Sequence, residues 1–111
     1  MNGAELQCSR EFLGLSGTWV AEKLGVDRRS VNRWESGEHP VPNYVEQNIK
    51  AWLGITQRAV GVASVQLRNQ PHRPLSVLRE DGDTEWPSEW YRTVAARAVE
   101  ITGGRITWET P

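Results

Sequence analysis

Four polar residues lie close together in the chain and have side chains suited to reading the edges of nucleotide bases. They are Arg28, Arg29, Asn32 and Arg33. The planar guanidinium of arginine can donate two hydrogen bonds to O6 and N7 of guanine, and the amide of asparagine can pair with the edge of adenine. The alternative is an ordinary solvated helix face, which charged side chains often form. The elements around these residues decide between the two interpretations.

A helix that carries all four residues is predicted between Asp27, a candidate N-cap, and Gly37, which ends it. Val31 and Trp34 are three residues apart and would share the inward face of this helix. With a rotation of about 100° per residue, the arginines and the asparagine then project from the opposite side and from the exposed first turn. The sequence therefore predicts a polar face that meets solvent or DNA.

A shorter helix precedes this one and is joined to it by a tight turn. Ser16 offers an N-cap oxygen, apolar residues follow at Trp19, Val20 and Leu24, and Gly25 ends the helix. Two helices joined by a turn of about three residues that begins with glycine have the geometry of a helix-turn-helix.

One more helix is predicted before this pair, over residues 4–13. Its apolar positions are Leu6, Phe12 and Leu13, and Gly14 follows it as a left-handed cap would. Cys8 lies within this helix, where we expect a small packed side chain and not a redox switch. As the single cysteine of the chain, it excludes an internal disulfide.

The residues around the turn also carry a resemblance. The segment LSGTWVAEKLGVDRRSVNRWESGEHPVP resembles the Cro/CI, or XRE, type of helix-turn-helix regulator, and the likeness extends over about residues 5–53. The elements that carry it are Gly14-Leu15-Ser16, Ala21 in the second helix, Leu24-Gly25-Val26 in the turn, and Trp34-Glu35-Ser36-Gly37 at the end of the third helix.

This resemblance implies a role for each matching position. It places base reading on Arg28, Arg29, Asn32 and Arg33, phosphate contacts on Gly17, Thr18, Ser36 and His39, and a structural ion pair on Arg10 and Glu35. Many members carry a glutamine at the position of Gly17, whose side chain helps to clamp a phosphate. Here the backbone amides and Thr18 remain, and a helix N-terminus can still hold an anion.

The second half of the chain predicts a long helix and then a small mixed region. The helix begins after Pro40 and Pro42, has apolar residues at spacings of three and four, and has candidate bends at Gly54 and Gly61. Proline-containing residues 69–74 end it. There follow a strand over 75–78, an acidic turn over 80–85, a helix capped by Ser88 with Trp90, Val94, Ala98 and Ile101 on its apolar face, and a strand over 105–109.

The fold class that follows is mainly α with a small β component. We expect an XRE-type helix-turn-helix DNA-binding domain over residues 1–55, a long linking helix, and a strand-helix-strand dimerisation region within 56–111. The tryptophans of that region are more than one helix and two short strands can bury, so we expect a homodimer, the alternative being ordinary core packing. The expected interface comprises Leu75, Val77, Trp86, Trp90, Val94 and Trp108.

The whole chain also resembles the anti-CRISPR-associated autorepressors, a phage-borne group with an XRE-type domain and a C-terminal dimerisation region. The likeness rests on Trp34-Glu35-Ser36-Gly37, Val41-Pro42, the strand at Leu75, and Trp90-Tyr91-Arg92 with Val94-Ala95-Ala96. It implies a dimeric repressor of its own phage or mobile-element operon, an anti-CRISPR operon among the candidates. Such a dimer would read two half-sites of an inverted repeat about 34 Å apart in double-stranded DNA.

Two other functions remain open. An antitoxin of a toxin–antitoxin pair also couples an XRE-type domain to a partner-binding tail, and a co-purifying toxin would identify it. An enzyme would use Glu80, Asp81, Asp83 and Glu85 as a metal or acid–base cluster, but this is ordinary turn composition with no histidine close in sequence. We therefore expect no catalytic residue, metal, cofactor or small-molecule ligand.

Net charge and hydropathy limit which of these functions are possible. The net charge is −1, which is unusual for a DNA-binding protein, so the basic residues must be well placed: three arginines fall within positions 28–33. No apolar run approaches the length of about 18 residues that a membrane span needs, and the N-terminus has no basic leader. We expect a cytoplasmic protein of a bacterial cell.

Overall fold

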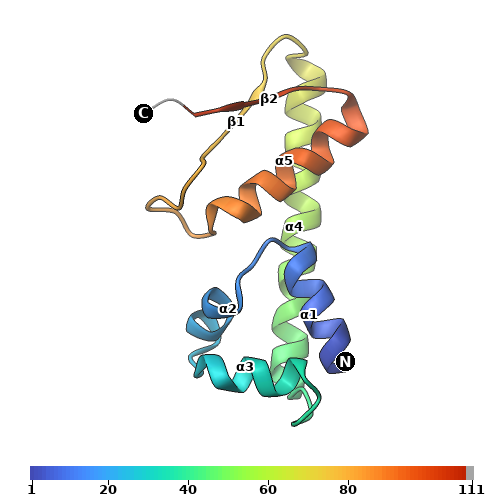
Figure 1. The fold of residues 1–111 in the computed structure, drawn as a ribbon. Coiled ribbons are helices and arrows are strands. Elements are labelled where there is room, and N and C mark those ends of the chain that lie inside the picture. Colours follow the sequence, from blue (N-terminus) through green and yellow to red (C-terminus); the bar gives the residue numbers. More distant parts are fainter. Residues whose placement is uncertain (110–111) are drawn as a thin grey trace. The chain divides into compact units, whose positions relative to one another are not determined.

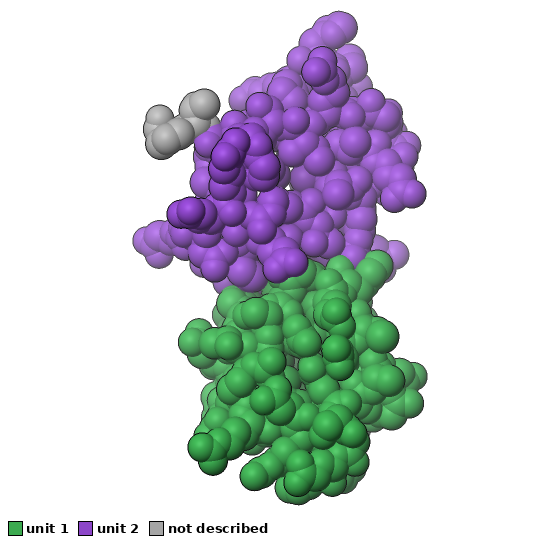
Figure 2. All heavy atoms as spheres, viewed as in Figure 1, with its two compact units in different colours: residues 1–54 green, residues 55–111 purple. Residues whose placement is uncertain are grey.

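The computed structural model describes residues 1–109, which form two compact units: residues 1–54 and, from residue 55 on, the rest of the chain (Figure 2). The described part is mainly helical with one small parallel sheet, which confirms the fold class expected from the sequence (Figure 1). None of its helices is long and apolar enough to cross a membrane. The elements in chain order are α1 (Gly3–Phe12), α2 (Gly17–Leu24), α3 (Arg28–Glu35), α4 (Asn43–Asn69), β1 (Leu75–Val77), α5 (Ser88–Thr102) and β2 (Ile106–Trp108).

The first unit contains α1, α2, α3 and the start of α4 around one apolar core. Its buried side chains are Leu6, Leu13, Leu15, Val20, Ala21, Val31, Trp34, Val45, Ile49 and Trp52. Most of them are positions that the helical spacing predicts; Leu15, between α1 and α2, and Ala21 are additions. Three predicted positions are not fully buried: Trp19 and Leu24 are half-buried, and Phe12 is 56% exposed.

Cys8 is also exposed, so the expectation of a packed side chain at this position is wrong. The reason is helical geometry: Cys8 follows the fully buried Leu6 by two residues, a rotation of about 200° that directs it away from the core.

The start of α1 is held by two features that the sequence analysis missed. Asn2 and Glu5 form a capping box, with the Asn2 side chain accepting from the Glu5 amide at 2.8 Å and the Glu5 carboxylate accepting from the Asn2 amide at 2.8 Å. Gly3 lies against the end of α3: a Cβ on this residue would be 2.3 Å from the carbonyl oxygen of Trp34 and 2.5 Å from that of Glu35. Glycine therefore permits the close approach of the two helices.

The second unit contains the remainder of α4, which continues through Gly61, and a β1-α5-β2 segment. The two strands are parallel, with Leu75 beside Ile106 and Val77 beside Trp108. Helix α5 connects the strands and packs against both of them. Its expected apolar face is buried at Trp90, Val94 and Ala98, whereas Ile101 is 57% exposed, contrary to expectation.

Two tryptophans of this unit are buried by the chain itself. Trp86 and Trp90 stack with ring centroids 4.6 Å apart, and Trp90 Nε1 donates to the buried hydroxyl of Thr56 on α4 at 2.9 Å. The expectation was that one helix and two short strands could not bury Trp86, Trp90 and Trp108 together. Trp86 and Trp90 are buried with the help of α4, which the sequence analysis treated as a link, whereas Trp108 is 46% exposed. Val77 and Val94 are buried in the same unit, so four of the six expected interface residues already lie in its interior.

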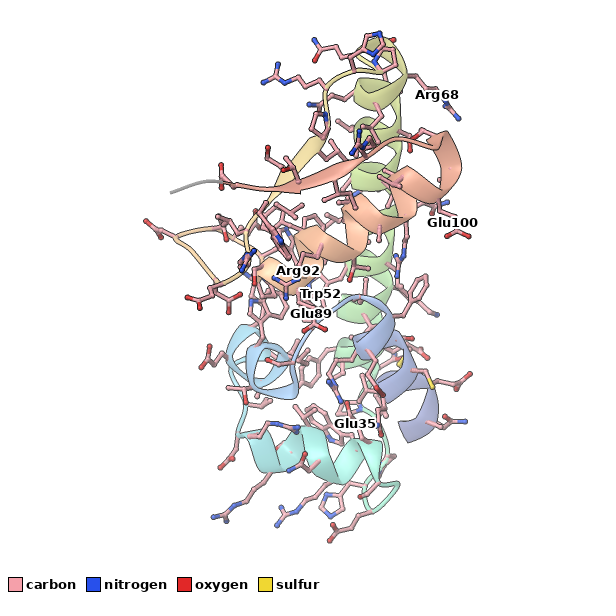
Figure 3. The ribbon with its side chains drawn as sticks, turned by 45° about the horizontal axis from the view of Figure 1, so that its top comes forward. Glu35, Trp52, Arg68, Glu89, Arg92 and Glu100 are labelled. Atoms are coloured by element: carbon pink, nitrogen blue, oxygen red, sulfur yellow. The ribbon has the colours of Figure 1, made fainter. Side chains whose placement is uncertain are left out.

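The start of α5 also corrects the sequence analysis. Ser88 was expected as the N-cap, but it is the first helical residue and Pro87 occupies the cap position. The Ser88 amide donates instead to Asp81 Oδ1 at 2.7 Å, from seven residues upstream. Arg92, labelled in Figure 3, adds a second tie, because its Nη1 donates to the carbonyls of Leu78 and Arg79 at 3.0 and 2.8 Å.

Candidate nucleic-acid interface

A three-residue turn connects α2 to α3. Gly25 ends α2 in the left-handed conformation, with φ at 68°, which glycine adopts without steric strain. The Val26 amide donates to the carbonyl of Ala21 at 2.9 Å and closes the turn. Asp27 then caps α3, because its side chain accepts from the Arg29 amide at 3.1 Å. These local signals fix where the second helix of the motif begins.

Helix α3 has one buried face and one polar face. Val31 and Trp34 are buried in the first unit. Arg29, Asn32 and Arg33 are exposed on α3, and Arg28 is half-buried at its first position. The guanidinium groups of Arg29 and Arg33 are thus accessible from solvent on the helix that a helix-turn-helix places in the major groove.

Arg28 is arranged differently from the other two arginines. It donates a hydrogen bond to Asn32 Oδ1, one turn later on α3. Its guanidinium also lies against Gly17, the first residue of α2, where a Cβ would be 2.2 Å from Arg28 Cζ. Arg28 therefore occupies the space that a side chain at position 17 would need. Its positive charge stands beside the amide groups that open α2.

The segment after α3 turns back on the helix end. Ser36 is the C-cap, its hydroxyl donates to the Arg33 carbonyl at 3.2 Å, and it accepts from the Glu38 amide at 3.4 Å. The His39 amide donates to the same carbonyl of Arg33 at 3.1 Å. Both Ser36 and His39 are exposed, so their side chains lie on the surface next to the end of α3.

An ion pair fixes α3 against α1. Arg10 donates from Nε and Nη2 to the two carboxylate oxygens of Glu35 at 2.7 and 3.1 Å, and from Nη1 to the carbonyl of Leu15 at 3.0 Å. Only 13% of the Arg10 side chain and 9% of the Glu35 side chain are exposed. This paired arginine is a structural group that orients α3, on which Glu35 is labelled in Figure 3.

The structure brings three of the expected site residues, Gly17, Arg28 and Asn32, together. Arg28 contacts both Gly17 and Asn32. The contact with Asn32 could be predicted, because residues four apart are neighbours on a helix, whereas nothing in the sequence around Gly17 indicates its contact with Arg28. In the acidic turn, Asp81 Oδ1 accepts from the Ser88 amide at the start of α5, and Glu80, Asp83 and Glu85 are exposed. Among residues 1–109, no group of three or more histidine, cysteine, aspartate or glutamate side chains is arranged to hold a metal ion.

Comparison with known families agrees with this geometry. Residues 3–51 match the family model of a helix-turn-helix domain, a span that covers α1, α2, α3 and the first turns of α4. No curated protein matched the chain. The N-terminal part of the chain is therefore a helix-turn-helix domain, which supports a DNA-binding regulator.

Proposed function

We propose that the chain is an XRE-type transcriptional repressor that binds a specific inverted repeat of double-stranded DNA as a homodimer. The observation that supports this most is the polar face of α3, where exposed arginines stand opposite buried Val31 and Trp34. With a net charge of −1, the chain has no general excess of positive charge to attract phosphate. Affinity and selectivity must therefore come from the few basic groups at this face.

In this proposal Arg29, Asn32 and Arg33 read base edges, the arginines at guanine and the asparagine at adenine. Arg28 shares the reading face through its hydrogen bond to Asn32 and also takes the place of the missing clamp at position 17, because its guanidinium stands at the opening of α2. The amides of Gly17 and Thr18, with Arg28, would hold one phosphate at the positive end of the α2 dipole. Ser36 and His39 would contact the backbone beyond α3.

We further propose that the repressor acts on its own promoter in a phage or mobile-element operon, an anti-CRISPR operon among the candidates. Two copies are needed because one small helix-turn-helix buries too little surface for selective binding, and a two-fold dimer matches an inverted repeat. The antitoxin alternative is less favoured, because the second unit has its own core around Trp86 and Trp90 and is not a tail that folds on a partner.

The test is a mobility-shift titration of the full chain with a duplex from its own promoter. Arg29→Ala and Arg33→Ala should each weaken binding by about 1–3 kcal/mol and relax base preference at the position read. Arg28→Ala should weaken binding to unrelated as well as cognate duplexes and lower the salt dependence, as expected for a phosphate contact, and should also relax base preference because Asn32 loses its partner. Arg68→Ala, an exposed position on α4, is the control and should bind as the parent does.

Two results would contradict the proposal. If both Arg29→Ala and Arg33→Ala bound the cognate duplex as tightly as the parent at physiological salt, α3 would not be the reading helix. If the parent bound every duplex equally, the chain would not be a sequence-specific repressor.

A further inference from the structure

The outer edge of β2 is an unpaired strand edge. In the parallel ladder the Leu75 amide donates to the Arg105 carbonyl at 2.9 Å, and the Glu109 amide donates to the Val77 carbonyl at 2.8 Å. These bonds direct the backbone groups of the alternate residues, Ile106 and Trp108, away from β1. Within residues 1–109 the sheet has only these two strands, so that edge faces outward.

Apolar side chains accompany this edge. Ile106 is 40% exposed and Trp108 is 46% exposed, and both lie beside β1 residues on one face of the sheet. The Arg79 guanidinium lies 4.8 Å from the centroid of the Trp108 ring, which holds the indole by a cation–π contact. An exposed strand with an apolar face is a template for pairing with another strand.

The sequence of this edge is complementary to itself when read in the opposite direction. Around Thr107 the residues are Arg105, Ile106, Thr107, Trp108 and Glu109. If a second copy of β2 pairs antiparallel with a two-fold axis at Thr107, then Arg105 faces Glu109 of the other copy and Ile106 faces Trp108. One face of the strand pair gains two ion pairs, and the other gains two contacts between an aromatic and a β-branched side chain.

The backbone agrees with this register. In an antiparallel pair the residues whose amide and carbonyl groups point at the partner alternate with residues whose groups point away. Ile106 and Trp108 direct theirs outward, so they would exchange hydrogen bonds across the axis, and Thr107 would be a non-hydrogen-bonded pair with its own copy. A single register thus satisfies the backbone, the charges and the apolar side chains together.

We propose that the occupant of the β2 edge is a second copy of this chain, paired antiparallel about Thr107, which makes a four-stranded sheet in the order β1, β2, β2, β1. This inference rests on the proposed function in that it names the interface of the dimer proposed there. A two-fold interface requires a self-complementary surface, because if residue i of one copy contacts residue j of the other, then residue j of the first copy contacts residue i of the second. The opposite charges of Arg105 and Glu109 favour this copy over an unrelated strand.

A charge exchange tests the register by sedimentation velocity over a concentration series. Arg105→Glu and Glu109→Arg should each raise the dimer Kd by about tenfold or more, because the symmetric interface contains each like-charge pair twice. The double variant R105E/E109R should restore the parent Kd to within a few fold. If the single variants dimerise as the parent does, or if the double variant stays monomeric while its circular dichroism matches the parent, the register is wrong.

Disulfide trapping tests the axis, in a Cys8→Ser background because Cys8 is exposed. Thr107→Cys should form a covalent dimer on mild oxidation, since Cα atoms of a non-hydrogen-bonded antiparallel pair are about 4.5 Å apart, within reach of a disulfide. Ser76→Cys is the matched control: it neighbours Thr107 on β1 and is exposed, but the two copies would be separated by three strand spacings, about 14 Å. Ser76→Cys should therefore stay uncrosslinked.

Each outcome decides the proposal. Trapping at Thr107 and not at Ser76 supports it, and trapping at Ser76 alone, or a parent that is monomeric throughout, overturns it. These measurements need no DNA, so the two proposals can fail separately. A trapped Thr107 dimer that binds no promoter duplex would contradict the repressor, whereas a dimer that binds its operator without trapping at Thr107 would contradict the β2 interface.

Discussion

Two exposed surfaces of the chain, one in each unit, present different chemistry. In the first unit, α3 presents arginine and asparagine side chains opposite a fully buried Val31. The second unit has apolar side chains at its surface, with Val62 and Val65 exposed on α4 in addition to Ile106 and Trp108 on β2. Arginine and asparagine side chains can form paired hydrogen bonds with the edges of bases, and exposed apolar surface often binds another protein. The polar face is the surface that we propose to read DNA, and the β2 edge is the surface that we propose to join two copies.

The largest effect is expected when the ion pair between Arg10 and Glu35, which holds α3 against α1, is removed. Glu35→Ala leaves the Arg10 guanidinium buried without its carboxylate, so we expect a loss of about 3 kcal/mol in the free energy of unfolding, measured in urea. Glu38→Ala, an exposed position three residues beyond the end of α3, should change it by less than about 0.5 kcal/mol. Equal stability of the two variants would show that the ion pair does not hold α3.

The second effect concerns the close approach of α1 to α3. Gly3→Ala places a Cβ against backbone carbonyls that cannot rotate away, and we expect a loss of about 1–3 kcal/mol in the free energy of unfolding. Gly61→Ala is the matched control, because nothing lies within 4 Å of its added Cβ in α4. There alanine should stabilise by about 0.5–1 kcal/mol. A Gly3→Ala variant as stable as the parent would contradict the contact.

The smallest effect is expected at Asp81, which accepts from the first amide of α5, and it depends on pH. The hydrogen bond from the Ser88 amide lowers the pKa of Asp81, so the carboxylate stabilises the fold at neutral pH and loses this contribution as the pH falls through the lowered pKa. Asp81→Ala should therefore cost about 1 kcal/mol at pH 7, and its difference from the parent should shrink in acid. Asp81→Asn, which can still accept the bond, should lose less and show no such titration. A difference that does not change with pH would contradict the assignment.

The sequence predicted the first unit better than the second. In the first unit the sequence signals are local. Gly25 and Asp27 lie at the helix ends that they determine, and Val31 and Trp34 lie on the helix whose buried face they define. The helix-turn-helix was predicted from these residues. The contact of Gly3 with α3 was missed, because only the folded chain brings residues so distant in sequence together.

In the second unit the decisive contacts are longer in range. Trp90 donates to Thr56 across 34 positions, and Asp81 accepts from the first amide of a helix that begins seven residues later. The residues next to each of these partners in the sequence do not indicate the contact. The sequence analysis therefore did not include α4 in the core that buries Trp86 and Trp90. The site was predictable as a helix face, but the placement of Arg28 against Gly17 depends on how two helices pack.

The distribution of tryptophans gives each unit a spectroscopic signal of its own. In the first unit Trp19 and Trp52 meet edge to face with centroids 5.3 Å apart, and in the second Trp86 and Trp90 are stacked with an interplanar angle of 15°. Indoles fixed in such pairs produce near-ultraviolet circular dichroism that disappears when specific packing is lost. Replacing one ring at a time by phenylalanine would assign the bands, and melting could then be followed separately for the first unit and for the second.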